Sequence, residues 1–208
     1  MKKSDFIAVV VLGEIVAIFL GFIIKGLRMN LPVPIFVLYI LLPIVAVVTN
    51  AVFYWIGKKI PIFFQFAKFI TVGLANTAVD FGILNFLMWS SGTYEGKSII
   101  LFNVVSFLIA AVHSYAWNKL WTFKAKEKTN VASQFLQFVV ISFIGVLINS
   151  GIVYIIITWV SPLTGVEAWA NIAKVVATAV SLVWNFVGYK FIVFKKKNGE
   201  QPSNIPQV

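Results

Sequence analysis

The sequence contains no cysteine, one histidine and only seven acidic residues among its 208 positions. The absence of cysteine excludes disulfides, thiolate metal sites and cysteine nucleophiles. So few carboxylates leave little for general acid–base catalysis. The sequence also lacks G-x-S-x-G and H-E-x-x-H motifs, a phosphate-binding glycine loop, and a D-x-D motif on a sizeable loop. We therefore expect a protein that is not an enzyme and that binds neither a metal nor a cofactor.

Charge is scarce and apolar residues dominate. Charged residues make up 12% of the chain and hydrophobic residues 60%, with a mean hydropathy of +0.94, whereas a soluble domain is about a quarter charged. Each apolar stretch is near the ~20 residues that cross a bilayer. The sequence predicts an all-α integral membrane protein with six transmembrane helices, at residues 6–24, 35–56, 65–89, 99–121, 135–160 and 169–194.

The first apolar stretch follows two lysines, as in a signal peptide. Glu14 interrupts it, however, and no A-x-A-like cleavage site follows. We interpret it as a retained transmembrane helix.

Loop charges predict the topology. The net charge of +10 comes from lysines in short loops, so its counterpart is the anionic membrane surface and not a nucleic acid. One set of loops carries three cations, Lys25, Arg28 and Lys97. The other set carries ten: Lys2, Lys3, Lys58, Lys59, Lys124, Lys126, Lys128, Lys195, Lys196 and Lys197. The positive-inside rule then predicts a multi-pass plasma-membrane protein with both termini, including a disordered tail at 196–208, in the cytoplasm.

The second part of the chain contains an internal repeat. "FAKFITVGLANTAVDFGI" (66–83) aligns with "FLQFVVISFIGVLINSGI" (135–152), and "HSYAWNKLWTF" (113–123) aligns with "WNFVGYKFIVF" (184–194). Each unit spans the membrane twice, so both units have the same orientation and the last four helices form two parallel two-helix repeats. We predict an extra transmembrane hairpin at 1–60, a four-helix core at 61–195 and the tail at 196–208.

Small and polar residues follow one face of each core helix. On the first, Gly73, Asn76, Thr77 and Asp80 have i, i+3, i+4, i+7 spacing. Such stripes often serve helix packing. Ionisable groups cost ~2.5–3.5 kcal/mol inside a membrane and are functional hypotheses by default. We expect the four stripes to converge on a substrate path, with these candidate binding residues: Asn76, Asp80, Asn103, Asn118, Lys119, Asn149, Lys174, Asn185 and Lys190.

Asp80 and Lys174 are the most informative of these residues. At ~1.5 Å per residue, Asp80 lies ~20 Å from the cytoplasmic start of its helix and Lys174 ~7 Å from the outer end of its own. The two depths are similar, so the residues can form an ion pair if their helices touch. That pair can be structural or functional, and the sequence leaves both readings open.

The other titratable residues also have competing explanations. Lys68, Lys119 and Lys190 lie near the cytoplasmic interface, where snorkelling explains each one, but a ring of lysines there would also attract a lipid phosphate. Glu14 is expected to pair with a lysine of the core. His113 is more typical of a packing residue than of a metal ligand.

The motifs resemble those of the GtrA-like family of small membrane proteins. They are "FxxFxxVGxxNTxxDFGI" from residue 66, "NKLWTF" at 118–123 and "WNFVGYKFIVF" at 184–194. The resemblance implies a flippase for a polyprenyl phosphate or polyprenyl-phosphate-linked sugar, serving cell-surface polysaccharide or glycan biosynthesis. It assigns family positions to Asp80, Asn118, Lys119 and Asn185. The "IVF" ending after Lys190 and the extra hairpin depart from the family pattern.

Two other functions fit the residues. One is an ion-coupled small-solute transporter that uses Asp80, Glu14 and His113 as a relay. The other is a non-transporting membrane subunit that scaffolds a glycosyltransferase. The expected partners are a polyprenyl-phosphate lipid or lipid-linked sugar, membrane lipids, a glycosyltransferase and a second copy of the chain in a homodimer, but no nucleic acid.

Overall fold

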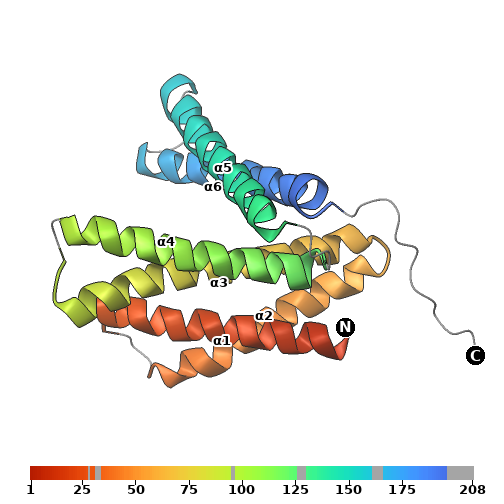
Figure 1. The fold of residues 1–208 in the computed structure, drawn as a ribbon, viewed down its shortest axis with the longest axis horizontal. Coiled ribbons are helices and arrows are strands. Elements are labelled where there is room, and N and C mark those ends of the chain that lie inside the picture. The colour runs from red at the N-terminus through yellow and green to blue at the C-terminus, as the bar shows by residue number, and fades with distance from the viewer. Residues whose placement is uncertain (28, 31–33, 95–96, 126–129, 161–165, 196–208) are drawn as a thin grey trace, which may run out of the picture. The chain divides into compact units, whose positions relative to one another are not determined.

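The computed structural model describes residues 1–27, 29–30, 34–94, 97–125, 130–160 and 166–195, and for 166–171 the backbone only. Six α-helices in this part are long and apolar enough to cross a membrane, which confirms the predicted all-α membrane fold (Figure 1). They are α1 (Lys3–Gly26), α2 (Phe36–Gly57), α3 (Pro61–Ser91), α4 (Lys97–Trp117), α5 (Val131–Trp159) and α6 (Val166–Gly188). The predicted tail and the loop cations Arg28, Lys126, Lys128, Lys196 and Lys197 lie outside the described residues.

The chain forms two compact units, Met1–Lys124 and Ala125–Val208. In the first unit, α3 packs against α1, α2 and α4. In the second, α5 packs against α6 and the two helices cross (Figure 1). The extra hairpin α1–α2 therefore shares a unit with the first repeat hairpin α3–α4.

Helices α1 and α3 pack closely along their length. A Cβ atom added to Gly82 of α3 would lie 2.6 Å from the Cβ of Phe19 of α1 and 2.9 Å from its carbonyl oxygen. Only glycine permits this approach, which is typical of small residues between membrane helices. Near the other end of α1, Val9 and Leu12 are fully buried against Val72 of α3. The extra hairpin is thus an integral part of the first unit.

A buried ion pair joins α1 to α3 at the lysine-rich end of the unit. Lys68 of α3 donates a hydrogen bond to Asp5 of α1, and these residues are only 4% and 3% exposed. Asp5 also accepts a hydrogen bond from the Trp121 indole at 3.1 Å. The interpretation of Lys68 as a snorkelling interfacial lysine was therefore wrong, because the side chain points inward to a carboxylate. The carboxylate that pairs with a core lysine is Asp5, whereas Glu14 forms no ion pair with any described residue.

Each repeat hairpin ends in a π-helical turn at an aligned position. These turns are η1 (Asn118–Thr122) after α4 and η2 (Tyr189–Val193) after α6. Each closes with a 2.8 Å backbone hydrogen bond, from Phe123 to Asn118 and from Phe194 to Tyr189. The hairpins thus share a local structural feature that the sequence alignment did not reveal. Their parallel orientation in the membrane stays a prediction.

A glutamine from the first helix of each hairpin holds the π-turn of that hairpin. Gln65 of α3 donates to the Thr122 carbonyl at 3.2 Å, and Gln134 of α5 donates to the Val193 carbonyl at 2.9 Å. The two glutamines occupy aligned positions in the repeat, and so do Thr122 and Val193. Because carbonyls at a helix end lack intrahelical partners, this side-chain donor satisfies one of them and fixes the turn.

Candidate functional site

Asp80 forms a polar contact between α3 and α4. Its carboxylate accepts a 2.7 Å hydrogen bond from the hydroxyl of Ser106, which is fully buried. The same hydroxyl lies 3.1 Å from the carbonyl oxygen of Asn103. Asp80 and Lys174 belong to different units, and the ion pair expected between them stays a prediction. The described partner of Asp80 is the neutral hydroxyl of Ser106.

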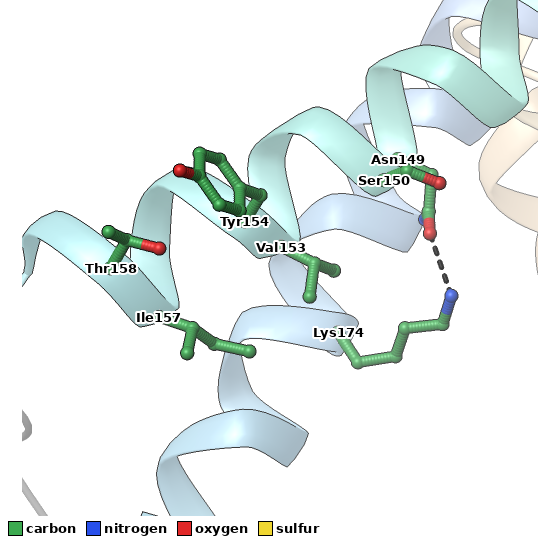
Figure 2. A pocket seen from close by; sticks show the side chains of 7 residues that line it. All are labelled: Asn149, Ser150, Val153, Tyr154, Ile157, Thr158 and Lys174. Carbon is green, nitrogen blue, oxygen red and sulfur yellow. Dashed lines mark hydrogen bonds between the residues drawn. The ribbon is translucent and has the colours of Figure 1, made fainter.

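At the position aligned with Asp80, the second hairpin has the neutral Asn149, and a lysine of the next helix lies beside it. Lys174 of α6 donates a 2.7 Å hydrogen bond to the amide oxygen of Asn149 on α5 (Figure 2). The amide nitrogen of Asn149 lies 3.4 Å from the hydroxyls of both Thr178 and Ser181. This polar cluster holds the Lys174 ammonium against a neutral acceptor. Among the described side chains, no carboxylate compensates its charge.

The Lys174 ammonium borders a cavity of about 390 Å³ between α5 and α6 (Figure 2). The cavity is lined by Asn149, Ser150, Val153, Tyr154, Ile157, Thr158 and Lys174. It therefore combines one cation, one amide and three hydroxyls with apolar side chains. Such a mixture of apolar walls and a few polar groups is typical of sites for small ligands.

The three hydroxyl-bearing residues of this cavity were missed by the sequence reasoning. Ser150, Tyr154 and Thr158 follow i, i+4, i+8 spacing, which places them on one face of α5. This spacing was available in the sequence as a signal. The aligned repeat ends at residue 152 and therefore does not include Tyr154 or Thr158.

The lysines of the π-turns have aromatic surroundings. In η1, Lys119 donates a 3.1 Å hydrogen bond to the hydroxyl of Tyr115 and lies 5.4 Å from the centre of its ring. In η2, the Lys190 ammonium lies 5.7 Å from the ring centre of Phe186 and 5.5 Å from that of Phe191. Cations at these distances are attracted to the negative face of an aromatic ring.

The remaining predicted residues have different surroundings. Asn118 is 1% exposed and donates to the carbonyl of Ser114 at 3.0 Å, so it stabilises the start of η1. Asn103 has an exposed side chain. The side-chain oxygens of Asn76 and Asn185 are buried and accept no hydrogen bond from the described part of the chain. The structure thus groups the candidates within each unit, and convergence of all four stripes stays a prediction.

Asn185 packs against a glycine in a way that explains a difference between the repeats. A Cβ atom on Gly145 would lie only 2.5 Å from the side-chain oxygen of Asn185. At the aligned positions, the first hairpin has Asn76 in place of this glycine and Ser114 in place of this asparagine. The larger residue of the pair thus lies on the second helix in one hairpin and on the first helix in the other.

This exchange predicts the behaviour of substitutions at Gly145. We expect Gly145→Ala to destabilise the protein by ~1–3 kcal/mol, the usual cost of overpacking. Gly145→Asn alone should also be destabilising, and the addition of Asn185→Ser should recover most of its loss, because the double variant has the residue pair of the first hairpin. Thermal unfolding in detergent measures both effects. A double variant no more stable than Gly145→Asn alone would contradict the proposed exchange.

The polar residues described above lie in a part of the chain that matches a known protein family. The family model described as "GtrA/DPMS, transmembrane domain" matches residues 68–194, more than half of the chain. The chain belongs to this family. The match covers α3 to η2 and includes every candidate binding residue named above. It begins at Lys68, the residue that pairs with Asp5, so the buried ion pair joins the extra hairpin to the first residue of the GtrA-like region.

Related proteins include named translocases. The chain is 29% identical over 127 residues to the uncharacterized membrane protein YngA of Bacillus subtilis (strain 168), covering 61% of this chain and 77% of the relative. It is 27% identical over 130 residues to the bactoprenol-linked glucose translocase of Salmonella phage P22, and 26% identical to that of Shigella phage SfII. Each of these two matches covers 62% of this chain and 94% of the relative. No solved structure matches the chain significantly.

Proposed function

We propose that the protein is a flippase that moves a polyprenyl phosphate, or a sugar linked to one, across the plasma membrane for cell-surface glycan synthesis. The observation that carries this proposal is the Lys174 ammonium at the edge of the α5–α6 cavity. It lies in a membrane-spanning helix, and its described hydrogen-bond acceptor is the neutral amide of Asn149. An intramembrane cation without a counter-charge is costly unless an anionic ligand supplies that charge. The names of the phage relatives support a lipid-linked sugar as the cargo.

The cavity has the chemistry that such a cargo requires. Moving a phosphate through hydrocarbon costs many kcal/mol unless the anion is paired and hydrogen-bonded. Lys174 supplies the positive charge, and the hydroxyls of Ser150 and Thr158 with the amide of Asn149 can exchange hydrogen bonds with sugar hydroxyls. At about 390 Å³, the cavity lies in the range of small-molecule sites. The isoprenoid chain then stays in lipid, where its transfer needs no protein groups.

Asp80 has a complementary role in this proposal. A carboxylate accepts hydrogen bonds only, so it can bind sugar hydroxyls but repels a phosphate. Ser106 holds it in place from the neighbouring helix. Asp80 therefore contributes to the sugar end of the path or balances the charge of Lys174 when no cargo is bound. Both roles require the negative charge of Asp80, whereas a role in helix packing alone would not.

Transport in reconstituted vesicles tests the proposed function. Purified protein in liposomes should move a labelled polyprenyl-phosphate-linked hexose between leaflets at rates well above protein-free vesicles. Absence of lipid movement together with a pH-dependent flux of a small solute would replace the proposal with ion-coupled transport. Absence of both, with co-purification of a glycosyltransferase, would identify a scaffolding subunit instead.

A further inference from the structure

The two π-turns differ in how they hold their lysines. Both turns begin at aligned positions, close with the same backbone hydrogen bond and are held by an aligned glutamine. Both carry a lysine at the second residue of the turn, Lys119 in η1 and Lys190 in η2. Each turn forms the C-terminal end of its hairpin, so the two lysines occupy the same place in the local backbone geometry.

The two lysines differ in whether a hydrogen-bond acceptor lies one helical turn before them. The residue four positions before Lys119 is Tyr115, whose hydroxyl accepts a hydrogen bond from the ammonium at 3.1 Å. The residue four positions before Lys190 is Phe186, which offers only its ring, at 5.7 Å. Within the described residues, the Lys190 ammonium therefore has aromatic faces beside it but no hydrogen-bond acceptor. No described residue occupies its three N–H donors, which can bind a ligand.

We propose that each π-turn lysine binds the phosphate group of a lipid and that the Tyr115 hydroxyl makes the η1 site weaker than the η2 site. The inference rests on the proposed function for the identity of the lipid. An ammonium donates charge-assisted hydrogen bonds to phosphate oxygens. At Lys119 the phosphate must compete with the phenol for one of the three donors, whereas at Lys190 it does not. Tyr115 thus lowers the affinity of one of two sites that occupy aligned positions.

The glutamines determine where the lysines lie. Gln65 and Gln134 each attach a π-turn to the first helix of its own hairpin. Because the side-chain amide bonds to a backbone carbonyl of the turn, it restricts the position of the turn without contacting the lysine. They are positioning residues for the two phosphate sites.

Reciprocal substitutions at the aligned aromatic positions test the proposal. The measurement is equilibrium binding of a short-chain fluorescent polyprenyl phosphate to the full-length protein in detergent. Tyr115→Phe should tighten the weaker site by roughly threefold to tenfold, the range expected for one net hydrogen bond. Phe186→Tyr should weaken the stronger site by a similar factor. Lys119→Gln and Lys190→Gln identify which site is which, because each should remove one of the two binding events.

Several outcomes would overturn the inference. Equal affinities at both sites in the wild-type protein, or no tightening by Tyr115→Phe, would contradict the role of the hydroxyl. Tyr115→Phe only removes an atom, so it decides the question even if Phe186→Tyr fails to fold. Loss of the hydrogen bond from Gln65 to the Thr122 carbonyl in Gln65→Leu should weaken only the site that Lys119→Gln removes. Weakening of both sites would instead indicate a general structural role.

The binding assay also separates this inference from the proposed function. Two graded binding sites in a protein that does not move lipid in vesicles would refute the flippase and leave the inference intact. Lipid movement in vesicles, with no effect of the aromatic substitutions on binding, would support the flippase and refute the inference about the two sites. Competition with inorganic phosphate identifies the source of the ligand. Displacement of the fluorescent lipid at millimolar inorganic phosphate would assign the sites to free phosphate, and its absence would assign them to the lipid headgroup.

Discussion

Replacing Asp5 with leucine is expected to lower the free energy of unfolding by ~3–5 kcal/mol, the typical cost of leaving one partner of a buried ion pair without the other. In Asp5→Leu, Lys68 remains only 4% exposed and loses its counter-charge, and the indole of Trp121 loses its acceptor. The double variant Asp5→Leu/Lys68→Leu should recover most of that loss, because replacement of a buried pair by apolar residues is often neutral. Equilibrium unfolding in mixed SDS micelles measures both values.

Glu14 offers a matched control for this experiment. It is a carboxylate on the same helix, is half-buried and forms no ion pair with the described residues. Glu14→Leu should therefore leave stability unchanged or raise it slightly. If Asp5→Leu costs no more than Glu14→Leu, the ion pair does not anchor the extra hairpin. If the double variant is as unstable as the single one, the loss reflects packing and not charge.

The ion pair shows where sequence reasoning about membrane proteins reaches its limit. The six helices follow from composition, because a bilayer requires long apolar segments whatever their packing. Asp5 lies in "MKKSDF" beside two lysines, and Lys68 follows a lysine-rich loop, so both have the pattern of flanking residues. Only the close packing of α1 on α3 removes them from water. The residue pattern of one helix does not predict which other helix packs against it.

The sequence predicts candidate residues but not their local partners. Asp80, Asn149 and Lys174 are candidates because charged and amide groups are rare in apolar membrane helices. The structure pairs Lys174 with Asn149, its neighbour within one hairpin, and Asp80 with Ser106, also within one hairpin. Depth along the membrane normal is calculable from sequence, but the rotation of each helix about its axis depends on its neighbours. The local partners therefore required the structure.

The π-turns also could not be predicted from the sequence. Their residues were aligned correctly, as "NKLWTF" and "YKFIVF". A π-turn, however, differs from an α-helix only by one residue in hydrogen-bond register. What reveals its role is the side-chain donor from the neighbouring helix, Gln65 or Gln134, and that contact is tertiary.

Removal of the Lys174 charge should have the largest effect on transport. We expect Lys174→Gln to lower the rate of lipid movement in vesicles by tenfold to a hundredfold. A loss of ~1.4–2.8 kcal/mol in the stabilisation of the phosphate is enough for that change. Lys174→Arg keeps the charge and should retain part of the activity. Lys97→Gln removes a lysine that is exposed at the start of α4 and serves as the matched control. A wild-type rate in Lys174→Gln would remove this residue from the transport path.

Asp80→Asn separates charge from packing at the other polar position. Asparagine is the residue that the second hairpin has at the aligned position, Asn149, so a helix of this kind accommodates it. Its amide oxygen can still accept the hydrogen bond from Ser106, which leaves the α3–α4 contact in place. Slower transport of the sugar-linked lipid with an unchanged melting temperature would therefore assign a role to the charge itself. A selective loss for the sugar-linked lipid over the bare polyprenyl phosphate would place Asp80 at the sugar, whereas equal losses for both would make it the counter-charge of the cation.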